Sequence, residues 1–250
     1  MTCIAIIFLF LEKRFTCQHT ATNYTFAAII NPPPMCFSAA ASFGASAVLT
    51  GIGVASLKQV KEPAQYPFAS IPLIFGIQQF IEGIVWVSST HPEWAVLQEP
   101  ASYGFLGVAQ IIWPLLFPIA FSLMEKDSRR RNFMKLLQIP GIIIAAYFLY
   151  CLAFFSMETR IVSHHVFYDI DFPRKLIPIA AGFYLAATVA APLFSTDYRI
   201  KVIGGILLAG YLVARIFFQP SLISVWCFFG IACSFVVYIV LRNPKLKTAV

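Results

Sequence analysis

The segment Phe75–Trp86, FGIQQFIEGIVW, carries a carboxylate and two amides inside an otherwise apolar run. Gln78 and Gln79 precede Glu82 by four and three residues, so one face of a helix would carry all three side chains. If the run is a membrane helix, this face should point away from lipid, because an ionisable group facing lipid costs roughly 2.5–3.5 kcal/mol or more. Such a carboxylate predicts either a polar site for a ligand or a hydrogen-bonded lock between helices.

Further polar groups within or beside apolar runs extend the candidate ligand site. They are Cys36, Gln110, Arg215 and Cys227. Arg215 could pair with Glu82 between helices, or it could extend its guanidinium to the membrane interface. Gln78 and Gln79 could line a cavity, or they could bond only to neighbouring helices.

The connection SMETRIVSHHVFYDIDFPRK holds a second set of groups, namely His164, His165, Tyr168 and Asp169. Tyr168 is a further candidate ligand contact. Imidazole and carboxylate together suit zinc, so His164, His165 and Asp169 are candidate metal ligands. No H-E-x-x-H spacing is present, and a solvated loop explains the same residues. No P-loop, nucleophile elbow or dinucleotide fingerprint occurs, so no other cofactor is indicated.

The composition predicts a membrane protein. Of the 250 residues, 59% are apolar and 12% are charged, and the mean hydropathy is +0.78. A soluble domain is nearer half apolar and a quarter charged. The net charge of +7 does not indicate nucleic-acid binding, because the basic residues form short clusters between apolar runs. The expected partner is therefore the lipid bilayer.

Seven apolar stretches are long enough for a helix to cross the hydrocarbon core, which takes about 20 residues. They are continuously apolar, without the alternation of a barrel strand, so we expect an all-α bundle of seven transmembrane helices. The expected spans are roughly Phe37–Leu57, Phe68–Ser88, Tyr103–Leu123, Leu136–Phe155, Leu176–Phe194, Lys201–Phe218 and Ser221–Leu241.

Lysine and arginine residues divide unevenly between the two ends of these spans. Downstream of the first span, three lie in one set of connections (Arg160, Arg174 and Lys175) and twelve in the other set with the C-terminal tail. Because cytoplasmic connections carry the basic excess, the C-terminus is predicted to be cytoplasmic and the N-terminus outside. Glu82 then lies about 6 Å to the outer side of the midpoint of its span. The histidine-bearing connection also lies outside.

Residues 1–34 do not fit this plan. Cys3–Leu11 is too short to span a membrane, and basic residues follow this apolar run, whereas those of a signal peptide precede it. The segment is expected to be a mobile or interfacial extension, or upstream sequence from a misassigned start with Met35 as the true first residue. We favour the second interpretation. The expected transmembrane domain is 35–242, followed by a cytoplasmic tail at 243–250.

Several blocks downstream of residue 34 carry a family resemblance. They are MCFSAAASFG (Met35–Gly44), IQQFIEGIVW (Ile77–Trp86), WPLLFP (Trp113–Pro118), HHVFYD (His164–Asp169) and SVWCFFG (Ser224–Gly230). The chain resembles a bacterial family of seven-span membrane proteins with no established function. The resemblance implies an integral protein of a cell membrane, here a bacterial inner membrane. It supplies no activity and no catalytic residues.

Three classes of function follow from these observations. The first is a small-molecule binding or sensing protein with a polar pocket in the outer half of the bundle, and we favour it. The second is a metal-dependent membrane hydrolase, similar in span count to the ceramidase and adiponectin-receptor superfamily. The third is a small-solute transporter. No catalytic residue set is identified, so a non-enzymatic protein is favoured, and the oligomeric state is left open.

Overall fold

The structure is a computed structural model that describes residues 38–162, 165–171, 174–218 and 221–242. Contacts divide the chain into Met1–Met35 and Cys36–Val250, and all described residues belong to the second unit. Four parts of the sequence predictions therefore lie outside the described residues. They are the extension at 1–34, Cys36, His164 and the tail at 243–250.

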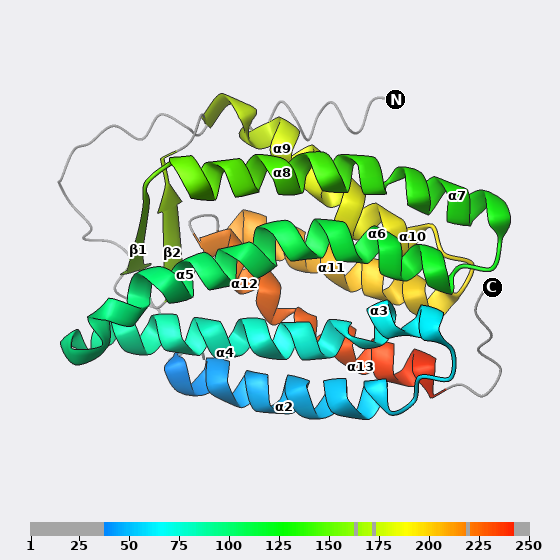
Figure 1. Ribbon diagram of the computed structural model, residues 1–250, viewed down its shortest axis with the longest axis horizontal. Helices are drawn as coiled ribbons and strands as arrows, with labels where there is room; N and C mark the ends of the chain where they lie inside the picture. Colours follow the sequence, from blue (N-terminus) through cyan, green and yellow to red (C-terminus); the bar gives the residue numbers. More distant parts are fainter. Residues whose placement is uncertain (1–37, 163–164, 172–173, 219–220, 243–250) are drawn as a thin grey trace. The chain divides into compact units, whose positions relative to one another are not determined.

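Helical segments occupy every stretch that the sequence predicts to be a span (Figure 1). In chain order they are α2 (Ala39–Leu57); η1 (Pro63–Gln65), α3 (Tyr66–Ala69) and α4 (Ile71–Thr90); η2 (Pro92–Leu97), α5 (Gln98–Leu106), η3 (Gly107–Ile112) and α6 (Trp113–Met124); α7 (Ser128–Leu136) and α8 (Gln138–Phe154); η4 (Arg174–Leu176), α9 (Ile177–Leu185), η5 (Ala186–Ala190) and α10 (Ala191–Leu193); α11 (Tyr198–Phe217); and α12 (Leu222–Phe228) and α13 (Gly230–Leu241).

Six helices among the described residues are long and apolar enough to cross a membrane. They are Ala39–Leu57, Pro63–Thr90, Pro92–Met124, Ser128–Phe154, Tyr198–Phe217 and Leu222–Leu241. The remaining expected span corresponds to Ile177–Leu193, an apolar helix that is shorter than these six. By length and composition, the described part of the chain therefore has helices suited to a membrane protein, six of them of full spanning length.

Side-chain caps explain where several helices begin. The hydroxyl of Ser38 accepts a hydrogen bond from the backbone N–H of Ala41 at 3.2 Å, at the start of α2. Asp127 and Asp197 likewise cap α7 and α11, with carboxylates that accept backbone N–H groups at 2.8 and 2.9 Å. Each cap satisfies a donor that the first helical turn leaves without an intrahelical partner.

Close helix packing fixes the position of α4. Helix α2 runs beside α4 (Figure 1), and a Cβ added to Gly53 would lie 2.7 Å from the backbone nitrogen of Leu73. On another side of α4, a Cβ added to Gly230 of α13 would lie 2.5 Å from the ring of Phe75. Only glycine permits these approaches, so α4 is tightly enclosed by α2 and α13.

The connection after α8 is an antiparallel hairpin, whereas the sequence predicted only a loop. Strand β1 (Met157–Val162) pairs with β2 (His165–Ile170) in a register that sets Met157 opposite Ile170. Alternate residues of β2, Val166 and Tyr168, are buried. The face of β2 that carries Tyr168 is therefore packed against the protein, as period-two alternation requires.

Polar and aromatic contacts hold the hairpin against α5. The hydroxyl of Thr159 donates to Ser102 Oγ at 2.9 Å, and Gln98 Nε2 donates to the Thr159 carbonyl at 3.0 Å. The ring of Tyr168 stacks on Phe105 with centroids 5.0 Å apart. These contacts fix the place at which Tyr168 meets the helices.

The α6–α7 connection, at the end of the helices opposite the hairpin (Figure 1), contains a buried carboxylate. Glu125, directly after α6, accepts hydrogen bonds from the backbone N–H and the hydroxyl of Thr196 at 2.7 and 2.6 Å, and from the N–H of Asp127 at 3.0 Å. Burial raises the pKa of Glu125, but these hydrogen bonds outweigh it, and the net effect is a lowered pKa. Glu125 thus ties the α6–α7 connection to the α10–α11 connection.

Candidate functional site

Helix α4 turns its polar face into the bundle, as the sequence predicts. The exposed fractions of Gln78, Gln79 and Glu82 are 0%, 1% and 3%. Their burial follows from their spacing, because residues three and four apart share one helix face. The prediction that this face points away from lipid is confirmed, while a ligand-binding role for the three residues stays a prediction.

The carboxylate of Glu82 has two neutral hydrogen-bond partners. The hydroxyl of Ser224, on α12, donates to Glu82 Oε1. The amide Nε2 of Gln79 donates to Glu82 Oε2 at 2.9 Å. Glu82 thereby connects α4 to α12, two helices that are far apart in the sequence.

Gln78 extends these contacts to a third helix. Its Nε2 donates to the thiol sulfur of Cys227 on α12 at 3.0 Å, and its Oε1 accepts from Nε1 of Trp113 on α6 at 2.7 Å. The Trp113 ring also stacks on Phe75 with centroids 4.0 Å apart. We use the name Glu82 cluster for six residues: Gln78, Gln79, Glu82, Trp113, Ser224 and Cys227.

Two buried polar atoms, one in this cluster and one on the neighbouring hairpin, have no hydrogen-bond partner in the described part of the chain. One is Oε1 of Gln79, and the other is the hydroxyl of Tyr168, whose side chain reaches the bundle from β2. Burial raises the pKa of Tyr168 well above its ordinary value, and the nearby Glu82 and Cys227 raise it further. Tyr168 also belongs to the same buried core group as Cys227, so the hairpin brings the Tyr168 side chain to the cluster.

The two remaining candidates from helical segments make no hydrogen bond to the cluster among the described residues. Gln110 is buried in the π-helical segment η3, and no hydrogen bond among the described residues joins it to Glu82. Arg215 is half-buried in the last turn of α11, next to Tyr211. The ion pairs of the described residues do not include Arg215 with Glu82. The hypothesis that these two residues form a lock is therefore not supported.

The structure separates two of the three predicted metal ligands. Asp169 accepts a hydrogen bond from Arg160 Nη2 at 2.8 Å, as part of an ion pair on the hairpin. The ring of His165 packs against Phe218 with centroids 5.0 Å apart. No group of three metal-binding side chains occurs among the described residues. The zinc hypothesis stays a prediction, since His164 lies outside the described residues.

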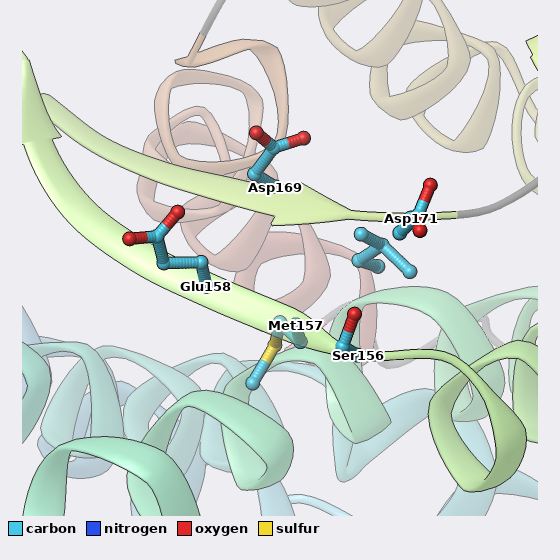
Figure 2. A pocket seen from close by; sticks show the side chains of 6 residues that line it. Ser156, Met157, Glu158, Asp169 and Asp171 are labelled. Carbon is cyan, nitrogen blue, oxygen red and sulfur yellow. The ribbon is translucent and has the colours of Figure 1, made fainter.

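A hollow of about 240 Å³ lies in the hairpin, away from the Glu82 cluster. Its lining consists of Ser156, Met157, Glu158, Asp169, Ile170 and Asp171 (Figure 2). Glu158 and Asp169 are directly opposite in the strand register, so both carboxylates lie on one face of the hairpin. Arg160 forms ion pairs with both carboxylates and partly neutralises them. Because the lining includes no residue of the Glu82 cluster, the hollow is a solvated acidic surface and not an extension of that cluster.

Ser224 and Trp113 belong to the cluster, although sequence reasoning did not select them as site residues. Ser224 precedes Cys227 by three residues, so the two share one face of α12. That spacing is the signal in the sequence that could have found Ser224. For Trp113 the sequence offers only its polar N–H in the middle of an apolar run, which requires a buried acceptor.

These features define a class: a helical protein with six helices long and apolar enough to span a membrane among its described residues, and with a buried polar cluster centred on one carboxylate. Comparison with known families matches residues 35–249 to a family of unknown function (DUF6629), so the chain belongs to that family. The match begins at residue 35, where the resembling blocks of the sequence also begin. Comparisons with the curated proteins and with the solved structures found no match.

Proposed function

We propose that this protein is a seven-span membrane protein that binds a small polar ligand at the Glu82 cluster. The observation that carries the proposal is a pair of buried polar atoms, Gln79 Oε1 and the Tyr168 hydroxyl, for which the described residues provide no hydrogen-bond partner. A buried polar atom without a partner costs about 1–3 kcal/mol. A lock between helices has no need of such atoms, whereas a binding site leaves them for its ligand.

The proposed topology places the N-terminus outside, the C-terminus in the cytoplasm, and Ile177–Leu193 across the membrane as the fifth span. Seventeen residues form a helix about 26 Å long, at the lower limit for a span. The distribution of lysine and arginine supports the orientation. The hairpin and the Glu82 cluster then lie on the outer side of a cell membrane, and α7 lies on the inner side.

Exposed apolar side chains support contact with lipid. On α8 they include Ile139, Ile142, Ile143, Leu149 and Phe154, each about half or more exposed. An apolar surface of this kind on a soluble monomer would be unusual. The hydrolase and transporter hypotheses remain untested predictions, and no contact among the described residues favours either of them.

Ligand binding can be tested by thermal unfolding of the purified protein in detergent. A panel of small neutral, anionic and cationic compounds is screened against the wild type, Glu82→Gln and Ser224→Ala. A compound that binds the folded state at 100 times its Kd stabilises it by about 2.7 kcal/mol. We expect at least one compound to raise the unfolding temperature of the wild type and to lose this effect in Glu82→Gln. A panel without any effect on the wild type would contradict the proposal.

The orientation can be tested by thiol labelling of intact cells. Cysteine is introduced at Glu158, which is exposed on the hairpin, or at Lys126, which is exposed before α7. A membrane-impermeant maleimide should label Glu158→Cys and leave Lys126→Cys unlabelled until the cells are opened. Labelling of Lys126→Cys alone in intact cells would reverse the topology.

A further inference from the structure

The carboxylate of the Glu82 cluster forms no ion pair with the residues that the structure describes. Glu82 is 3% exposed, and its two hydrogen-bond partners, Ser224 and Gln79, are neutral. The ion pairs in the described part of the chain all belong to Arg160 on the hairpin. Removing an ionised carboxylate from water costs several kcal/mol unless a positive charge compensates it. Either a proton or a cation neutralises such a carboxylate, and the contacts of Glu82 among the described residues supply no cation.

Besides the Gln79 nitrogen that donates to Glu82, the cluster and the neighbouring Tyr168 carry three polar oxygen atoms. Ser224 contributes a hydroxyl, Gln79 an amide carbonyl that has no donor, and Tyr168 a phenolic hydroxyl that has no partner. The nearest sulfur, in Cys227, already accepts a hydrogen bond from Gln78. Carboxylate, hydroxyl and carbonyl oxygens suit hard cations, whereas zinc and copper favour nitrogen and sulfur ligands.

The charge of the site selects a monovalent ligand. Calcium sites commonly use several carboxylates, and the described residues contain no group of three acidic or other metal-binding side chains. One carboxylate balances one positive charge. Its neutral oxygen neighbours can replace part of the hydration shell of a small ion, or accept hydrogen bonds from an ammonium group.

We propose that the Glu82 site binds a small monovalent cation, either a sodium-sized inorganic ion or the ammonium group of a small amine, through Glu82, Ser224 Oγ, Gln79 Oε1 and the Tyr168 hydroxyl. The inference rests on the proposed function and names the ligand class of the same site. The helices α4 and α12 supply three of the four ligands, and the hairpin supplies the fourth. A bound cation would therefore join the hairpin to the bundle at Tyr168.

Binding of ²²Na⁺ to the purified full-length protein, measured by scintillation proximity, tests the inference. We expect saturable binding to the wild type at about one ion per chain, and at least tenfold weaker binding to Glu82→Gln. Ser224→Ala removes one oxygen ligand and should weaken binding less. The matched control is Glu99→Gln, which neutralises an exposed carboxylate at the start of α5 and should leave binding unchanged.

Competition distinguishes the two sources of the positive charge. Displacement of ²²Na⁺ by unlabelled sodium, but not by methylammonium, assigns the site to an inorganic ion. If sodium does not bind, stabilisation of the wild type but not of Glu82→Gln by methylammonium chloride assigns it to an amine. Both results support the inference. Saturable ²²Na⁺ binding of equal strength in wild type and Glu82→Gln would overturn it, and so would the absence of any effect of both cations on the wild type.

Failure of the inference differs from failure of the proposed function. If no cation binds, but a neutral or anionic compound raises the unfolding temperature of the wild type and not of Glu82→Gln, the ligand class is wrong and the binding site stands. If no compound of any charge has an effect, both are wrong. Gel filtration of each variant confirms that it is folded before binding is compared.

Discussion

Replacing Glu125 by glutamine should weaken the link between the α6–α7 connection and the α10–α11 connection. The carboxylate accepts three hydrogen bonds, two at Oε1 and one at Oε2. The glutamine oxygen can keep the two at Oε1 as weaker neutral bonds. Its NH₂ group would then face the backbone N–H of Thr196, and that bond is lost.

The expected loss of stability follows from these bonds. One hydrogen bond to a charged group contributes about 1.5–3 kcal/mol, and loss of the charge weakens the other two by about 0.5 kcal/mol each. Glu125→Gln should therefore lower the free energy of unfolding by about 3 kcal/mol at neutral pH. The exposed Glu99→Gln control should change it by less than about 0.5 kcal/mol.

The assay is unfolding in mixed micelles by sodium dodecyl sulfate, followed by tryptophan fluorescence. Because the folded-state pKa of Glu125 lies below its ordinary value of 4.5, its stabilising effect is complete above that pH. The effect is lost as the pH falls through the lower folded-state pKa. The difference between wild type and Glu125→Gln should thus stay constant from pH 7 to about pH 5 and shrink at lower pH. Equal stabilities at pH 7, or a difference that does not shrink in acid, would refute this reasoning.

Three further substitutions test the packing around the Glu82 cluster. Gly230→Ala places a Cβ 2.5 Å from the Phe75 ring and should destabilise the protein by about 1–3 kcal/mol in the same assay. The control Gly205→Ala has open space at its Cβ and should not destabilise the protein. Equal effects of the two substitutions would contradict the packing of α13 on α4. Trp113→Phe removes the donor to Gln78 Oε1 but keeps a ring beside Phe75, so the free energy of unfolding should fall by about 1–3 kcal/mol. An unchanged free energy of unfolding would argue against the hydrogen bond between Trp113 and Gln78. Tyr168→Ala removes the ring that stacks on Phe105 and should speed the reaction of a small maleimide with the buried Cys227, whereas Tyr168→Phe should not. Mass spectrometry identifies the labelled cysteine. Equal rates in the wild type and both variants would show that Tyr168 does not cover the cluster.

The inward face of α4 could be predicted because it depends only on local periodicity and on the cost of a charge in lipid. Gln78, Gln79 and Glu82 are close in sequence, and any helix through them buries or exposes them together. The same reasoning gave helices at all seven apolar stretches. It did not predict that the helix Ile177–Leu193 is shorter than the other six, because the composition of this stretch resembles that of the neighbouring spans.

The partners of Glu82 could not be predicted, because they depend on which helices touch. The sequence offered Arg215 as the charged partner, whereas the structure brings Ser224 from α12 instead. Nothing in a single sequence states that α4 lies against α12 and not against the end of α11. The hairpin was also missed, since β1 and β2 are short and their pairing depends on docking to α5.

The central claim, that Glu82 binds a monovalent cation within the bundle, is tested most directly by the response of the unfolding temperature to such cations. Wild type and Glu82→Gln are unfolded in sodium chloride, methylammonium chloride and choline chloride at the same ionic strength. The account predicts that sodium or methylammonium raises the unfolding temperature of the wild type above its value in choline, and leaves that of Glu82→Gln unchanged. An effect of equal size in both proteins, or no effect of either cation on the wild type, would contradict it.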